Sequence, residues 1–82
     1  MAEIYRFDGI VVIMYPLGAD HEPAHIHARY GEYDAKFDLK NGEKIFGLFP
    51  NKQAAKIKNF IQTHQRELLK MWATGKIHKI RR

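Results

Sequence analysis

The first fifty positions either alternate between apolar and polar residues or run apolar on both sides, as β-strands do. Residues 10–15 are rich in β-branched side chains and apolar on both sides, which predicts a central strand covered on both faces. Pro23 favours an extended chain at the residue before it, and residues 25–30 then alternate in polarity with a period of two. Residues 3–7 are expected to form a short leading strand.

Two pairs of turn residues interrupt this pattern and predict β-hairpins. Gly31 and Glu32 suit a two-residue turn with glycine at its first central position. Asn41 and Gly42 form the strongest short hairpin signal in the chain. Together the two turns predict a three-stranded meander over residues 24–30, 33–40 and 43–49.

Two-residue turns also determine which residues face each other across the meander. The first turn places His25 opposite Asp38, and the second places Phe37 opposite Phe46. The face expected to line the core carries Ile26, Ala28, Tyr30, Tyr33, Ala35, Phe37, Leu39, Phe46 and Leu48. The opposite face is expected to carry His25, His27, Arg29, Asp34, Lys36 and Asp38, together with Ile45, Gly47 and Phe49.

After the meander, apolar residues recur at three- and four-residue spacing, which predicts one long helix. Asn51 suits the N-cap position, the helix is expected to continue to about Thr74, and Gly75 is a typical stop signal. His64 falls in the middle of the apolar stripe, so we expect it to be buried between helix and sheet in a structural role. The stripe itself consists of Ile57, Phe60, Ile61, Leu68, Met71 and Trp72.

These elements predict a single α+β domain over residues 1–82, with a mostly antiparallel sheet of about four strands and one long C-terminal helix packed on one face. The sheet region is expected to span residues 1–50, the helix 51–75 and a basic tail 76–82, either a short edge strand or a frayed arm.

The chain contains no cysteine, so disulfides and thiolate metal sites are excluded. No signal peptide is visible, and the longest apolar run is far shorter than the ~20 residues of a membrane helix. We therefore expect a cytoplasmic protein without membrane contact.

The net charge of +5 is unevenly distributed along the chain. Residues 1–50 carry five basic and eight acidic residues, whereas residues 51–82 carry nine basic residues and one acidic residue. A cationic half suits a polyanion such as RNA or an acidic protein partner, and the alternative is a solvated helix with a lysine-rich outer face. We expect that removing residues 79–82 flattens the salt dependence of RNA binding without changing thermal stability. The candidate nucleic-acid-binding residues are Lys52, Lys56, Lys70, Lys79, Arg81 and Arg82.

The histidine-rich segment that opens the meander is the strongest candidate for chemistry. On a strand, His25, His27 and Arg29 project to one face, and His21 lies in the loop before them. One hypothesis is a zinc site in which His21 supplies a third ligand and a bound water becomes the nucleophile, as in a metal-dependent hydrolase. The cationic neighbours Arg29 and Lys36 disfavour a dication there, so we expect no bound metal and no cofactor.

A second hypothesis is metal-free acid–base chemistry on a phosphodiester. His25 and His27 would divide the base and acid roles while Arg29 stabilises the charge that develops on the phosphate. Asp38 would hold His25 in one tautomer, and Tyr30 would lie at the end of this row of side chains, next to the turn. The alternative is a solvated sheet face with ordinary cross-strand pairs. The candidate catalytic residues are therefore His21, His25, His27, Arg29, Tyr30 and Asp38.

Three segments of the chain resemble one bacterial family. They are R-F-x-G-I-V-V-x-M-Y, D-H-x-P-x-H-I-H-A-R-Y-G-E-Y and, in the helix, H-Q-R-E-L-L-x-x-W. In these motifs the chain is similar, over almost its whole length, to the family called domain of unknown function 4160. Ala24 and Ile26 depart from the family's usual pattern, which has proline before the second histidine and phenylalanine between the last two. The matching positions are Arg6, Asp20, His21, His25, His27, Tyr30, Gly31, His64 and Trp72.

The resemblance implies a small bacterial protein, often encoded beside a second domain of unknown function, numbered 2442. This arrangement is similar to a type II toxin–antitoxin operon, and it implies an acidic antitoxin-like partner and a functional role for the histidines. The leading hypothesis is a toxin-like protein that acts on RNA. The alternative is a non-catalytic binding or regulatory module that docks a protein partner or nucleic acid through its basic half, and a metal-dependent hydrolase is the third.

Overall fold

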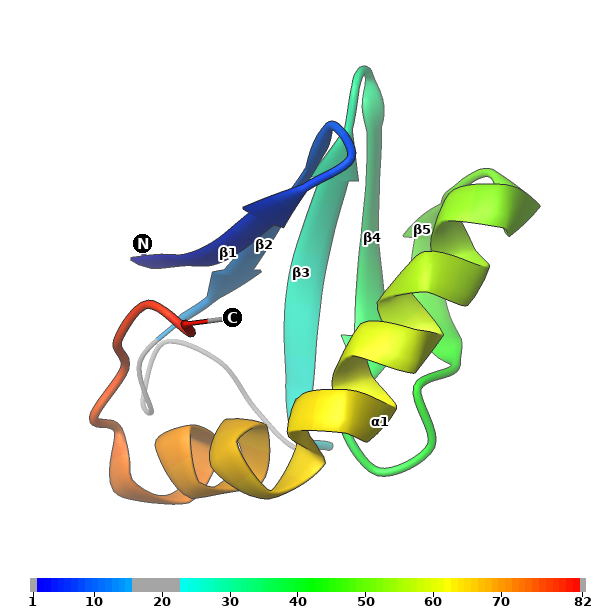
Figure 1. Ribbon diagram of the computed structural model, residues 1–82. Helices are drawn as coiled ribbons and strands as arrows, with labels where there is room; N and C mark the ends of the chain where they lie inside the picture. The colour runs from blue at the N-terminus through cyan, green and yellow to red at the C-terminus, as the bar shows by residue number, and fades with distance from the viewer. Residues whose placement is uncertain (1, 16–22, 82) are drawn as a thin grey trace.

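A five-stranded sheet followed by one long helix makes up the computed structural model, which describes residues 2–15 and 23–81 (Figure 1). All neighbouring strands are antiparallel, and their order in the sheet follows the chain. The α+β fold is confirmed, but the sheet has five strands rather than four, because the leading segment also pairs with the next strand, with one irregularity between Glu3 and Tyr5. The elements are β1 (Ala2–Phe7), β2 (Ile10–Met14), β3 (His25–Tyr30), β4 (Tyr33–Asp38), β5 (Lys44–Leu48) and α1 (Asn51–Thr74).

The core lies between one face of the sheet and α1. Val12, Ile26 and Phe37 come from three neighbouring strands and are all buried there. Alternation along each strand points these residues toward the helix and their sequence neighbours away from it. The predicted apolar stripe of α1 is confirmed, since all six of its members are buried: Ile57, Phe60, Ile61, Leu68, Met71 and Trp72.

The predicted register between β3 and β4 is confirmed. His25 lies opposite Asp38, and Arg29 lies opposite Asp34. Gly31 takes a positive φ of 58° in the turn between these strands, a conformation that glycine adopts without a steric penalty. The short turn therefore fixes the pairing of the histidine-bearing strand.

The second predicted hairpin is confirmed by the antiparallel pairing of β4 and β5, but its two-residue turn is wrong, because two polar side chains form local turns of their own. The Asp38 carboxylate accepts a hydrogen bond from the Lys40 backbone N–H (2.7 Å), and the Asn41 side chain accepts one from the Glu43 backbone N–H (2.8 Å). These contacts lengthen the connection, so β4 ends at Asp38 and β5 begins only at Lys44.

The longer connection and an irregularity after Lys36 change which residues of β5 reach the core. Lys36, rather than Phe37, lies opposite Phe46. Phe46 and Leu48 were expected in the core, but they are 70% and 76% exposed on the opposite side of the sheet. Phe49 was expected on the polar face and is instead buried in the core, where its ring lies 5.4 Å from that of Phe37.

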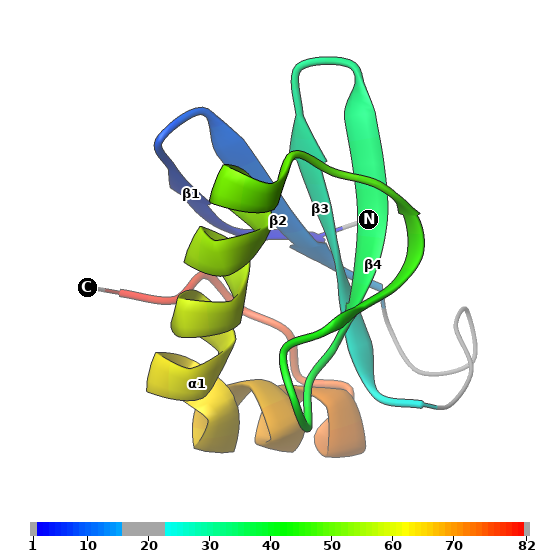
Figure 2. The same ribbon diagram turned by 90° about the vertical axis from the view of Figure 1, so that its right-hand side faces the viewer.

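The helix ends where the sequence predicts but is not straight. It stops at Gly75, which has a left-handed φ of 74°, and it is preceded by Pro50 rather than capped by Asn51. His64 has non-helical angles (φ −112°, ψ 20°) and divides α1 into two halves, which run in different directions in Figures 1 and 2. The first half covers the sheet, and the second passes below the end of β3 (Figure 1).

His64 is accordingly not buried between helix and sheet as expected. It is half-buried at the kink, with its ring 5.0 Å from the ring of Phe60 and 6.1 Å from that of Tyr5. A residue outside helical geometry cannot keep the place that a straight helical wheel assigns to it.

The C-terminal tail lies against β1. The backbone N–H of Ile80 donates a hydrogen bond to the carbonyl of Ile4 (2.7 Å), and the Ile80 side chain is buried in the core. The expectation that removal of residues 79–82 leaves stability unchanged is therefore wrong, because Ile80 is part of the fold. Within residues 2–15 and 23–81, no helix has both the length and the apolar character needed to cross a bilayer.

Candidate functional site

The sheet face opposite the core carries most of the residues with predicted chemistry. Strand register aligns them in two rows that cross β2, β3, β4 and β5. We call this surface the histidine face. Its first row contains Ile13, His27, Lys36 and Phe46, and its second row contains Val11, Arg29, Asp34 and Leu48. An imidazole, two cations and two exposed apolar side chains therefore share one surface.

His25 lies at the start of β3, on the same side as His27, but it is not part of a solvated face. It is only 4% exposed, and its ring centroid lies 5.0 Å from that of Trp72 and 5.1 Å from that of His27. The alternative of a solvated sheet face therefore fails at His25, because the kinked second half of α1 brings the indole of Trp72 against it.

One tautomer of His25 is selected by the backbone. Its Nδ1 lies 2.7 Å from the carbonyl oxygen of Pro23, and a carbonyl can only accept, so Nδ1 carries the hydrogen. In the neutral ring the lone pair is then on Nε2. This role was expected of Asp38, whose carboxylate instead accepts a hydrogen bond from the Lys40 backbone.

His27 is the half-buried member of the pair. Its ring meets the ring of Tyr15 edge-on, with centroids 4.6 Å apart and planes at 89°. Together with His25 and Trp72 these two residues form a continuous chain of rings, which we call the ring cluster: Tyr15, His27, His25 and Trp72. The cluster links the sheet to the end of α1 and leaves His27 as its more accessible imidazole.

Arg29 and Tyr30 lie on opposite faces of the sheet, although both were expected beside the histidines. Arg29 is exposed on the histidine face, with its Nε 3.3 Å from a carboxylate oxygen of Asp34. Tyr30 points to the opposite face, where its ring lies 6.4 Å from that of Phe49 and against Gly9. Tyr30 is therefore outside the candidate site, as the alternation along β3 requires.

Lys36 lies beside His27, as the predicted register placed it. It is the direct cross-strand neighbour of His27, and such neighbours have Cβ atoms about 4.5–5.5 Å apart. Its ammonium lies 5.7 Å from the centre of the exposed Phe46 ring, within range of a cation–π contact. Lys36 thus connects the imidazole to the exposed aromatic ring.

Two of the predicted residues, His21 and Arg82, lie outside the described residues. In the described part of the chain, no group of three or more histidine, cysteine, aspartate or glutamate side chains has a geometry suited to a metal ion. His25 and His27 are the two imidazoles from this motif that the structure brings together.

The predicted nucleic-acid-binding residues lie on three separate segments. Lys52 and Lys56 are in the first half of α1, and the Lys56 ammonium lies 3.1 Å from the carboxylate of Asp8. Lys70 is exposed on the second half of α1, beyond the kink. Lys79 and Arg81 are exposed on the tail that runs beside β1.

Sequence reasoning missed Tyr15, Trp72, Lys36 and Phe46 as components of the site. Tyr15 ends an apolar run and Trp72 belongs to a helical apolar stripe, so both patterns indicated core residues. Phe46 was placed on the wrong face by the assumed turn. The cross-strand neighbour of His27 was visible in the predicted register, and it was interpreted only as an argument against metal.

Comparison with models of protein families gives a match. The model of a family described as a domain of unknown function (DUF4160) matches residues 9–73, which include the histidine motif and most of α1. Neither the curated proteins nor the solved structures that were compared with the chain gave a match. Because the matched region covers well over half of the sequence, this chain belongs to the domain of unknown function 4160 family.

Proposed function

We propose that this chain is the toxin-like component of a bacterial toxin–antitoxin pair and that it cleaves RNA at the histidine face. One observation carries the proposal. A buried imidazole with a set tautomer, His25, lies against a more accessible one, His27, and the second is flanked by the cations Lys36 and Arg29. A pair of this kind suits proton transfer next to a phosphate.

In this proposal the two histidines do not share the general base and general acid roles, as the sequence hypothesis had them do. His25 is too deeply buried to contact an RNA substrate. It is therefore a positioning residue, whose ring packs against the ring of His27. His27 takes the proton from a ribose 2′-hydroxyl as its oxygen attacks phosphorus. The bond from phosphorus to the 5′-oxygen breaks, and that oxygen receives a proton from the Lys36 ammonium.

The charge that develops on the phosphate also needs a partner. Arg29 lies two residues beyond His27 on the same strand face, about 7 Å along the strand. Its guanidinium is exposed and held loosely by Asp34, so it is free to exchange this contact for a phosphate oxygen. A guanidinium in this place stabilises the transition state more than the substrate.

The proposal includes a partner and a place of action. The excess of basic residues in positions 51–82 suits an acidic antitoxin-like protein, which the family resemblance suggests is the neighbouring domain of unknown function 2442. Both proteins would act in the cytoplasm, where RNA is present as a substrate.

Expression in bacteria tests the proposal. Wild-type protein expressed alone should slow growth, His27→Ala should relieve the effect, and co-expression of the partner should relieve it as well. Gln62→Ala, an exposed position on α1, is the matched control and should remain harmful. Circular dichroism must show that both variants are folded. Harmless wild-type protein would refute the toxin assignment, and an equally harmful His27→Ala would refute the proposed chemistry.

A second candidate function is a non-catalytic binding module. It is favoured by the large exposure of Phe46 and Leu48, because edge strands with exposed apolar side chains are frequent docking surfaces. In this case a Phe46→Ala/Leu48→Ala variant would lose a binding partner, whereas His27→Ala would keep both the partner and the biological effect.

A further inference from the structure

A hollow that begins at the kink in α1 lies on a different part of the molecule from the histidine face. It lies between the second half of α1 and the C-terminal tail and has a volume of about 660 Å³. Pockets that bind small molecules usually measure about 300–1,000 Å³, so the hollow is large enough for a nucleotide or another phosphate ester. Its walls come from the second half of α1 and from the tail, which follows the left-handed turn at Gly75.

Cationic side chains dominate the lining of this hollow. We call it the kink pocket, and its polar lining includes His64, Arg66, Glu67, Lys70, Lys76 and His78. Three of these residues carry a permanent positive charge and one is a carboxylate. The pocket therefore has a positive balance even when both imidazoles are neutral.

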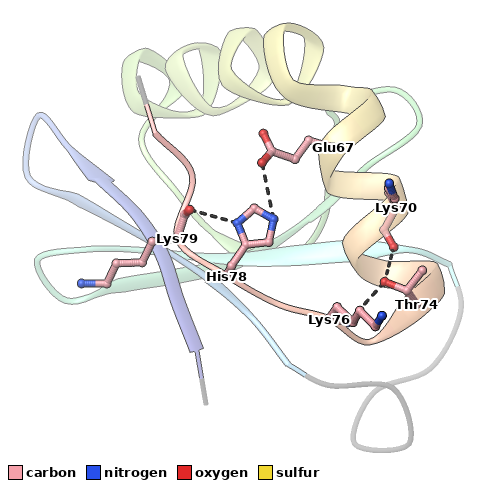
Figure 3. A network of polar contacts seen from close by, with 6 residues as sticks. All are labelled: Glu67, Lys70, Thr74, Lys76, His78 and Lys79. Carbon is pink, nitrogen blue, oxygen red and sulfur yellow. Dashed lines mark hydrogen bonds and ion pairs between the residues drawn. The ribbon is translucent and has the colours of Figure 1, made fainter.

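The carboxylate lies beside an imidazole of the tail. A carboxylate oxygen of Glu67 is 3.5 Å from Nε2 of His78, an ion pair when the ring is protonated, while Nδ1 of the same ring donates to the Lys79 carbonyl at 3.0 Å. Figure 3 shows the His78 ring between the helix and the tail, with Glu67 on one side and Lys79 on the other. This contact connects the tail to α1.

The position of Lys76 is fixed by the end of the helix. The Thr74 hydroxyl donates to the Lys70 carbonyl (2.8 Å) and accepts from the backbone N–H of Lys76 (3.3 Å), as Figure 3 shows. These bonds hold the first residue of the tail close to the last turn of α1. Lys70 and Lys76 therefore extend toward the pocket from backbone positions that these hydrogen bonds hold in place.

Like charges at these positions repel each other. Arg66 and Lys70 are four residues apart on α1, a spacing at which two cations destabilise a helix, and Lys76 adds a third across the pocket. A bound dianion would remove this repulsion and make charge-assisted hydrogen bonds to all three. The arrangement is therefore more favourable with an anion than without one.

We propose that the kink pocket binds a phosphoryl group, held by Arg66, Lys70 and Lys76. The group belongs either to a free phosphate ester such as a nucleotide or to the backbone of an RNA. The pocket does not depend on the chemistry of the histidine face, so either proposal can fail without the other.

Titration of ¹⁵N-labelled protein with inorganic phosphate, at ionic strength held constant with chloride, tests this proposal. Amide signals of residues 63–78 should shift and saturate. Lys70→Gln and Lys76→Gln should each weaken binding by about tenfold, the usual value of one hydrogen bond to a charged group. Lys40→Gln removes the same charge from an exposed loop and should leave the affinity unchanged.

The outcomes separate specific binding from general attraction. Shifts that do not saturate, or equal weakening in all three variants, would overturn the proposal. Titrations with adenosine monophosphate and with a short single-stranded RNA then identify the source of the phosphate. Competition between them at the signals of residues 63–78 indicates RNA backbone, and binding of the nucleotide alone indicates a free phosphate ester.

Discussion

Replacing Gly47 by alanine is expected to destabilise the protein strongly, because Gly47 leaves less room for a Cβ atom than the other described glycines with positive φ. Gly47 lies in β5 with a φ of +91°, and it is packed directly against the neighbouring strand. A Cβ atom at this position would lie 2.3 Å from the carbonyl oxygen of Asp34 and 3.0 Å from Cα of Ala35. Both are backbone atoms, so a side-chain rotation cannot relieve the clash.

The expected loss follows from two contributions. Holding an alanine at positive φ costs about 1–2 kcal/mol. Moving β5 away from β4 then weakens one or two ladder hydrogen bonds, each worth about 1 kcal/mol. The total of about 2–4 kcal/mol is a large share of the roughly 4–12 kcal/mol expected for a domain of this size. The melting temperature should fall by roughly 10–30 °C.

Gly31→Ala is the matched control, because Gly31 also has a positive φ (58°) but no atom lies within 4 Å of the Cβ position. This variant should lose only the free energy that an alanine costs at positive φ, about 1 kcal/mol. Urea unfolding followed by circular dichroism and by the fluorescence of the single tryptophan, the buried Trp72, measures both variants. Equal midpoints for Gly47→Ala and Gly31→Ala would refute the close approach of β4 and β5 and the register derived from it.

Three further predictions concern the tail, acid stability and metal. Deletion of residues 80–82 should lower the free energy of unfolding by about 1.5–3 kcal/mol, the usual value of one buried isoleucine, and an unchanged urea midpoint would contradict the docking of Ile80 on β1. The hydrogen bond from Arg6 holds the pKa of Glu3 below its ordinary value, so the charged carboxylate stabilises the fold near neutral pH. This contribution disappears as the pH falls through that lowered pKa, so Glu3→Gln should show a shallower loss of melting temperature in acid, whereas parallel curves would refute it. Elemental analysis of untagged protein should find no retained transition metal, and stoichiometric zinc that is lost in His25→Ala/His27→Ala would instead favour a hydrolase.

The strands and the helix ends were predictable because local residues determine them. Gly31 in a two-residue turn set the register of β3 with β4, and Gly75 marked the end of α1. The Asn-Gly pair predicted the second hairpin but not its register, because Asp38 and Asn41 used their side chains for competing turns. A longer connection of this kind changes the face to which every later residue of the strand points.

The kink at His64 had no signal in the sequence, since neither proline nor glycine lies nearby in the helix. Without the kink, Trp72 would have remained a simple core residue and His25 an exposed one. The contact between these two rings joins positions 47 residues apart, and residue periodicity contains no information about such contacts. The histidine motif was therefore found from the sequence, but the unequal environments of its two imidazoles were not.

Cleavage of RNA by the purified protein tests the central proposal most directly. Wild-type protein should cut single-stranded RNA in the presence of EDTA and leave 2′,3′-cyclic phosphate ends, because the proposed attack uses the 2′-hydroxyl. A substrate with 2′-deoxyribose throughout should stay intact. His27→Ala should reduce the rate by ~10²–10⁴-fold, the usual contribution of a general acid–base group, while Gln62→Ala should cut like wild type. No cleavage by wild-type protein, or equal cleavage by His27→Ala, would contradict the role assigned to His27.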